Sequence, residues 1–398
     1  MDRPSRQRGV AAVILIALFS VILIGVLLSS LAGKSSQNQA DEKSFPALAQ
    51  AQAALIAYAA SHPTLPGRLP CPDIDNDGLE DAPCGAAGAN QLGRLPWKTL
   101  GIPDLRDGSG ECLWYAVSGA FKSNPPNPGP VNSDTNGSFT IKDDQGHTIA
   151  TNAIAVILAP GAALSTDDRT PLGATRCGGN VTAANYLDTA NGINNALGAT
   201  TGVFVVGLPS DTYNDRVAFI SPAQFFPAVE RRVAGEIKQL LSKYYAINSY
   251  YPDANDFADA SHNCTQGTTR GRVPLSISLS CSSPSLADWP AALPAWFTAD
   301  NWYLLTYYTR APACSSLGPG CTDIGGLLIV SNGPSPTNNK QALVIVPGPS
   351  LPGVLPVQPS PCVSAANCLD GTNGDGDDIY TTQSPSPTFN DVVVIVSP

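Results

Sequence analysis

The chain has 398 residues, of which 43% are hydrophobic and 14% are charged. This apolar content excludes global disorder, and the length suits about two to three domains. Glycine and proline supply 36 residues each, which favours strands, turns and long loops over a helical bundle. A net charge of −10 without any basic stripe argues against nucleic-acid binding.

The amino terminus joins a short basic segment to a long apolar one. Residues 1–9 carry three arginines, and residues 10–33 contain no charged side chain. A helix over this run reaches roughly 36 Å, enough to cross a hydrocarbon core of about 30 Å. The positive-inside rule keeps residues 1–9 in the cytoplasm and exports the remainder. The sequence therefore predicts a single-pass protein of the bacterial inner membrane with its globular part in the periplasm.

The junction of these two segments resembles the leader of type IV pilins and pseudopilins. The residues Arg-Gln-Arg-Gly directly precede the apolar run, as at the site that prepilin peptidase cleaves, here between Gly9 and Val10. Major pilins carry a glutamate at the fifth mature position, where this chain has Ile14. The resemblance is therefore to minor pilins and pseudopilins that lack it. An uncleaved signal anchor and an ordinary cleaved signal peptide are the alternatives.

Residues 44–62 follow with an alanine-rich pattern that predicts an amphipathic helix. Its apolar face carries Leu48, Ala51, Leu55, Ile56 and Ala59. A kink or a restart is expected at Pro46, because proline lacks a backbone donor. A membrane helix that continues into an amphipathic one is also what the pilin resemblance implies.

The chain contains an internal duplication. Residues 183–192 resemble residues 365–374, and residues 213–222 resemble residues 389–398. Weaker matches keep the same order: residues 153–161 with 342–348, Trp114-Tyr115 with Trp302-Tyr303, and a helix pair that places Tyr58 on Tyr244. Two unrelated domains that share common turn motifs are the alternative.

The duplication sets the expected domain organisation. It comprises a leader at residues 1–9, a transmembrane helix at 10–33, and pilin-like modules at 34–222 and 223–398. The predicted fold class is α+β: the N-terminal transmembrane helix extends into a pilin-like helix, and two tandem modules of a helix plus an antiparallel sheet follow, stapled by disulfides.

The ten cysteines favour disulfides over zinc, because their number is even and no Cys-x-x-Cys pair occurs. Such bonds imply an oxidising compartment. Proximity in sequence predicts four pairs, and elimination gives the fifth. The expected bonds are Cys71–Cys84, Cys264–Cys281, Cys314–Cys321, Cys362–Cys368 and, by elimination, Cys112–Cys177.

Two acidic loops are candidate calcium sites. Between Cys71 and Cys84, alternating aspartates precede a glycine that permits a sharp turn, and oxygen ligands in this pattern suit a hard cation. The expected ligands are Asp73, Asp75, Asp77, Asp81 and the carbonyl of Leu79. A weaker second set is Asp370, Asn373, Asp375 and Asp377. The alternative for both loops is a solvated acidic turn.

Catalytic motifs are not evident in the sequence. The three histidines occupy polar or proline-flanked stretches outside any nucleophile or metal motif. We therefore expect a non-enzymatic pilin-like or pseudopilin-like subunit of a type IV pilus or secretion filament. The resemblance implies that it is processed by prepilin peptidase and binds other subunits through its N-terminal helix. The alternative is a membrane-anchored, exported, calcium-dependent binding or adhesion protein that does not enter a filament.

Overall fold

The computed structural model describes residues 39–397 except for 126–128, 172–176, 178, 278–280, 282–287, 317–320, 322–326, 333–334 and 352–360. The first helix covers residues 39–61. The other helices are α2 Gly198–Thr201, α3 Pro222–Asn248, α4 Ala295–Ala299 and α5 Trp302–Leu305. The strands of the first half are β1 Gln91–Arg94, β2 Trp114–Val117, β3 Phe139–Asp143, β4 Thr148–Ala153, β5 Ala155–Ala159, β6 Thr189–Ala190, β7 Ile193–Asn194, β8 Val203–Val206 and β9 Arg216–Ile220. Those of the second half are β10 Arg270–Arg272, β11 Tyr307–Arg310, β12 Leu328–Asn332, β13 Ser335–Lys340, β14 Ala342–Val346, β15 Ile379–Thr381 and β16 Val392–Ser397.

The two halves have the same sheet topology. A four-stranded antiparallel sheet has the order β1-β2-β5-β9 in the first half and β10-β11-β14-β16 in the second. Each half adds a three-stranded sheet, β4-β3-β8 or β13-β12-β15, in which the last strand pairs in parallel with the middle one. The expectation of purely antiparallel sheets missed these parallel pairs. The module bounds 34–222 and 223–398 stay a prediction.

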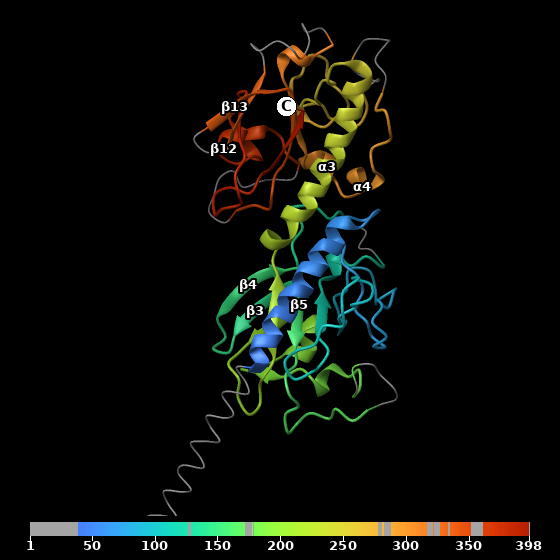
Figure 1. Cartoon of the computed structure of the whole chain (residues 1–398), viewed down its shortest axis with the longest axis vertical. Helices are drawn as coiled ribbons and strands as arrows, with labels where there is room; N and C mark the ends of the chain where they lie inside the picture. Colours follow the sequence, from blue (N-terminus) through green and yellow to red (C-terminus); the bar gives the residue numbers. More distant parts are fainter. Residues whose placement is uncertain are drawn as a thin grey trace, which may run out of the picture.

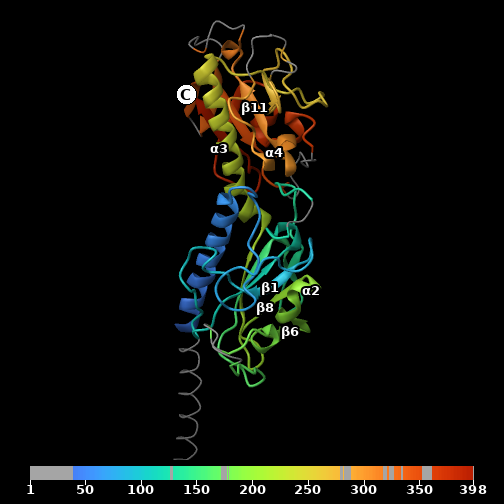
Figure 2. The same ribbon diagram turned by 90° about the vertical axis from the view of Figure 1, so that its right-hand side faces the viewer.

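Helices cover one face of each large sheet, and the two halves are stacked along the long axis (Figures 1 and 2). Because side chains alternate across a strand, Tyr115 and Ile157 face the first helix, whereas Trp114 and Val156 face the smaller sheet. The first helix buries Leu48, Ala51, Leu55 and Ala59 and runs without interruption through Pro46. The restart expected at this proline as an alternative to a kink does not occur.

The second helix, α3, belongs to both halves. Its first residues pack on the first half, where the ring of Phe121 lies 5.5 Å from that of Phe225 and 6.1 Å from that of Phe226. Farther along, α3 packs on β14 and β16. A capping box between Ser221 and Gln224 fixes its start. One continuous core therefore runs through both halves.

Within the described part of the chain, no helix combines the length and the apolar character that crossing a membrane requires. That finding contradicts the transmembrane part of the predicted fold class and the predicted single-pass inner-membrane localisation. The leader at residues 1–9 and the transmembrane helix expected at residues 10–33 lie outside the described residues. The fold class that the structure supports is α+β with disulfides.

Candidate functional site

All five predicted disulfides are present. The bonds are Cys71–Cys84, Cys112–Cys177, Cys264–Cys281, Cys314–Cys321 and Cys362–Cys368. Each links cysteines within one half of the chain. Five disulfides fit an exported protein, since such bonds form and persist in oxidising compartments.

The first acidic loop folds around Asp73, whose carboxylate is buried. Its Oδ2 atom accepts the backbone N–H of Gly78 at 2.7 Å, and its Oδ1 atom accepts that of Asn76. Gly78 has a φ of +90°, and a Cβ there would lie 2.6 Å from the Trp97 ring, so only glycine fits this turn. Burial raises the pKa of Asp73 to about 6 against the opposing effect of these two hydrogen bonds.

Three of the four predicted carboxylates converge in this loop. One oxygen each from Asp73, Asp75 and Asp81 lie within 4.8 Å of one another. Asp77 instead accepts the backbone N–H of Leu79 at 2.7 Å, and Leu79 is an exposed side chain. A set of hard carboxylate oxygens fits calcium in its chemistry. Calcium binding at this loop stays a prediction.

The second acidic loop divides into an inner and an outer part. Asp370 and Asn373 are buried, whereas Asp375 and Asp377 are exposed. The Asp375 carboxylate accepts the backbone N–H of Asp377 at 3.2 Å, and that of Asp377 accepts the backbone N–H of Ile379 at 2.7 Å. Among the described residues, the carboxylates of Asp370, Asp375 and Asp377 do not form a group whose oxygens lie within 4.8 Å of one another. Calcium binding by the predicted second ligand set stays a prediction.

A buried network that the sequence did not reveal joins Asp188, Asn195 and Asp215. The Oδ2 atom of Asp215 accepts the backbone N–H of Asp188 and the side-chain amide of Asn195, both at 2.9 Å. The Oδ2 atom of Asp188 accepts the backbone N–H of Asn214 at 2.7 Å. These bonds fix the loop that carries Asp188 to the start of β9.

The second half repeats this network with Asp370, Asn373 and Asp391. The Oδ2 atom of Asp391 accepts the Asp370 N–H and the Asn373 amide at 2.9 Å, and the Oδ2 atom of Asp370 accepts the Asn390 N–H at 2.7 Å. The repeated aromatic-Asn-Asp sequence at residues 213–215 and 389–391 was the only signal in the sequence. Asn195, rather than the Asn-Gly residue Asn191, is the counterpart of Asn373.

Both deeper carboxyls of these networks favour the protonated form. Burial, followed by the adjacent Asp188 or Asp370, raises the pKa of Asp215 and of Asp391 well above the usual range. Burial also raises the pKa of Asp188 to about 6. The Oδ1 atoms of Asp215 and Asp391 have no hydrogen-bond partner among the described residues. A charged carboxylate in this setting is costly, so burial favours the neutral form of Asp215 and of Asp391.

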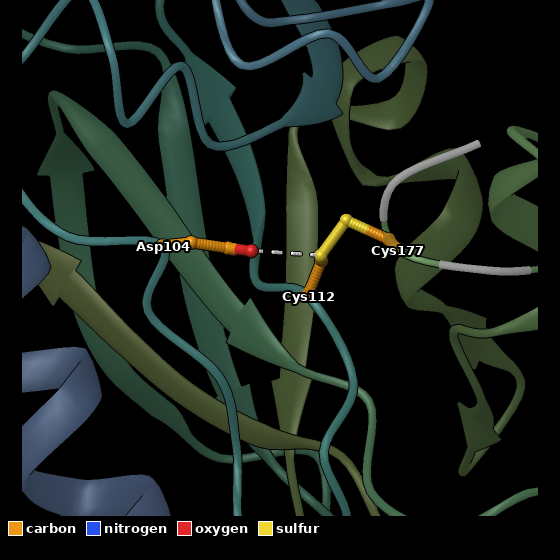
Figure 3. A group of neighbouring side chains, drawn as sticks. All are labelled: Asp104, Cys112 and Cys177. Carbon is orange, nitrogen blue, oxygen red and sulfur yellow. Dashed lines mark hydrogen bonds between the residues drawn. A yellow bond between two sulfur atoms is a disulfide. The ribbon is translucent and has the colours of Figure 1, made fainter.

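An aspartate also faces a disulfide in each half. Asp104 points at the Cys112–Cys177 bond, with its Oδ1 atom 3.9 Å from the Cys112 Sγ atom (Figure 3). Asp253 lies equally far from the Sγ atom of Cys281, which is bonded to Cys264. Because a metal needs a thiolate and these sulfurs are already bonded to each other, neither group is a metal site in the oxidised protein.

The histidines lie apart from these groups. His62 accepts the backbone N–H of Leu65 at 3.0 Å, and the exposed His147 contacts Asp143 at 2.9 Å. His262 lies edge-on to Tyr303. Trp114 and Trp302 are buried in the hydrophobic cores of the two halves.

A family-model scan, a search of curated proteins and a search of solved structures returned no match for this chain.

Proposed function

We propose that this chain is a non-enzymatic, exported pilin-like subunit of a type IV pilus or secretion filament, with two tandem modules as its head. The observation that carries the proposal is the order of elements, a helix followed by an antiparallel sheet that packs against it, which occurs twice. In the first half the helix is at residues 39–61 and the sheet is β1-β2-β5-β9.

The first helix is built for close packing on its sheet. Its buried face is dominated by small side chains at Ala47, Ala51 and Ala59, with Leu48 and Leu55 between them. The side-chain amide of Gln52 donates to the Phe219 carbonyl at 2.7 Å and so ties the helix to β9. Because the first helix is fixed to its sheet, the orientation of the chain that precedes the helix would set the orientation of the exported modules.

The partners in this proposal are prepilin peptidase and other pilin or pseudopilin subunits. Prepilin peptidase cleaves between Gly9 and Val10, and apolar residues 10–33 contact the same segment of neighbouring subunits. The decisive experiment is N-terminal mass spectrometry of the native protein from cells with and without prepilin peptidase, together with its detection in sheared filaments. A mature terminus at Met1 or beyond Ser30, or absence from filaments that contain the other subunits, refutes the proposal.

A second candidate function rests on the convergence of Asp73, Asp75 and Asp81. In this alternative the chain is an exported calcium-dependent binding or adhesion protein that never enters a filament. Calcium-dependent binding to a surface by a chain whose leader is uncut would favour this alternative. Leader cleavage with calcium-independent filament incorporation would exclude it.

A further inference from the structure

The carboxyl of Glu230 is buried on α3 where the two halves meet. Its side chain is 0% exposed, and neither carboxyl oxygen accepts a hydrogen bond of normal geometry from a described residue. The groups that face it are the Ser133 side chain from the first half, the Asp391 carboxyl at the start of β16, and Arg231 from its own helix. Burial raises the pKa of Glu230 well above its usual range; Ser133 opposes this shift, Asp391 adds to it, and Arg231 opposes it least.

The first helix lacks an acid at the corresponding position. When Tyr58 is aligned with Tyr244, Ser44 corresponds to Glu230, and both are buried. The Ser44 hydroxyl donates to the Ala40 carbonyl and accepts the Gly108 N–H, both at 2.9 Å, so it is satisfied within its own half. A carboxyl at this position is therefore particular to the junction between the halves.

Ser133 connects Glu230 to the second half. Its hydroxyl donates to the Pro347 carbonyl, just after β14, at 2.9 Å, and Ser133 is 3% exposed. A hydroxyl has one proton to donate and free lone pairs to accept with. A protonated Glu230 can donate to the Ser133 oxygen and leave the bond to Pro347 intact. An ionised Glu230 can use Ser133 only if the hydroxyl proton turns away from Pro347.

We propose that Glu230 is a proton-dependent latch of the junction between the two halves. With its carboxyl protonated, Glu230 donates to Ser133, which holds Pro347, and the junction is closed. Loss of the proton leaves a buried carboxylate that competes with Pro347 for the Ser133 hydroxyl, and the junction loosens. Because the closed junction holds the proton more tightly than the open one, the closed form is favoured at low pH and weakened as the pH rises.

Other junction contacts limit the motion to a local loosening. Asp300 of the second half accepts the backbone N–H of Val131 at 2.9 Å, and its carbonyl accepts the side-chain amide of Asn132 at the same distance. Arg68 also pairs with Asp300. These contacts keep the halves attached while the Ser133 loop opens.

The test is hydrogen–deuterium exchange of the full chain, read on residues 129–135 and 346–349 at pH 5 and pH 8. Glu230→Gln mimics the protonated acid, and comparison with wild type at each pH cancels the intrinsic pH dependence of exchange and the titration of Asp391. At pH 8 we expect at least about tenfold faster exchange in wild type than in Glu230→Gln, since each pH unit between the open and closed pKa changes the equilibrium about tenfold. At pH 5 the two should agree within about twofold.

Two further variants make the outcome decisive. The control is Glu236→Gln, a change at a half-buried acid on the same helix that pairs with Arg232 at 2.7 Å, and it should match wild type at both pH values. In Ser133→Ala, exchange should be fast at both pH values, and adding Glu230→Gln should not slow it. The latch is overturned if the ratio of the wild-type exchange rate to that of Glu230→Gln is the same at pH 5 and pH 8. It is also overturned if Glu230→Gln slows exchange as much in the Ser133→Ala background as it does in wild type.

Discussion

Replacing Arg68 by methionine should destabilise the protein strongly, because Arg68 is half of a buried ion pair between the halves. Its Nη2 atom lies 3.3 Å from the Asp300 Oδ1 atom, and both side chains are 4% exposed. Arg68 also donates to the carbonyls of Ala120 at 3.1 Å and Gly129 at 2.9 Å. Methionine keeps the apolar stem of the side chain, so the change removes charge and donors rather than bulk.

The magnitude follows from what the substitution leaves behind. Among the described residues, the buried Asp300 carboxylate would keep the Val131 N–H as its hydrogen-bond donor. Removing one member of a buried pair costs about 3–5 kcal/mol of unfolding free energy. Burial already raises the pKa of Asp300, against the Val131 hydrogen bond and Arg68. Without Arg68 the pKa of Asp300 rises further, so protonation of Asp300 at low pH relieves part of the loss. The loss of unfolding free energy in Arg68→Met should therefore be larger at pH 8 than at pH 5.

The assay is urea unfolding of the full chain, followed by circular dichroism and tryptophan fluorescence, for Arg68→Met, Asp300→Asn and the double variant. We expect the double variant to lose less than the sum of the single losses, with a coupling of roughly 1–3 kcal/mol. Arg232→Met is the control, because the Arg232–Glu236 pair is 38% and 23% exposed and such pairs contribute about 0.3–0.5 kcal/mol. Additive single losses, or an Arg68→Met loss no larger than the control, would refute the reasoning.

Three further predictions test the other sites. Millimolar calcium should raise the thermal midpoint of wild type but not of Asp75→Ala. At a hundredfold excess over Kd, calcium should add about 2.7 kcal/mol to the free energy of unfolding. An unchanged wild-type midpoint contradicts the calcium site. Stability should fall between pH 5 and pH 8, because the pKa of Asp391 is raised in the folded state, and Asp391→Asn should flatten this slope in a pH-dependent melting series. Tyr115→Phe and Tyr308→Phe should each cost about 1 kcal/mol in urea unfolding, since each hydroxyl donates to one buried carbonyl; unequal losses would argue that these positions are not equivalent.

Sequence reasoning succeeded where repetition was long or cysteines were close. The match of residues 213–222 with 389–398 located β9 and β16, which occupy the same place in the two large sheets. Four of the disulfides followed because nearby cysteines close short loops, and the fifth followed by elimination. The helix pair that placed Tyr58 on Tyr244 predicted a second helix, and α3 is found there at Pro222–Asn248.

Short matches misled where an insertion or a loop intervened. Trp302-Tyr303 was aligned with Trp114-Tyr115, yet it lies on α5, and the counterpart of Tyr115 is Tyr308 on β11. Their hydroxyls donate to the carbonyls of Pro70 at 3.2 Å and Pro252 at 2.9 Å. The shared hydrogen bond identifies equivalent residues better than a match of two residues does, and the sequence alone does not show that bond.

The parallel pairs and the carboxyl networks escaped prediction for a related reason. Strands β3 and β8 pair in parallel across some sixty residues of sequence, roughly as β12 and β15 do, and no local pattern encodes a partner at that distance. Likewise Asp188 and Asp370 read as ordinary loop acids until the last strand places Asp215 or Asp391 beside them. Acid content alone cannot separate surface turns from buried networks.

The difference between the halves bears most directly on what the chain does. Both halves contain a four-stranded and a three-stranded sheet of the same topology and the same aspartate network, so these features serve the folding of a module. Glu230, Ser133 and the Arg68–Asp300 pair have a role only where one module meets the next. Folding alone would have been served by a serine at Glu230, as at Ser44 in the first helix. A buried acid there lowers stability at neutral pH. In the proposed latch, this acid makes the contact between the two modules depend on pH.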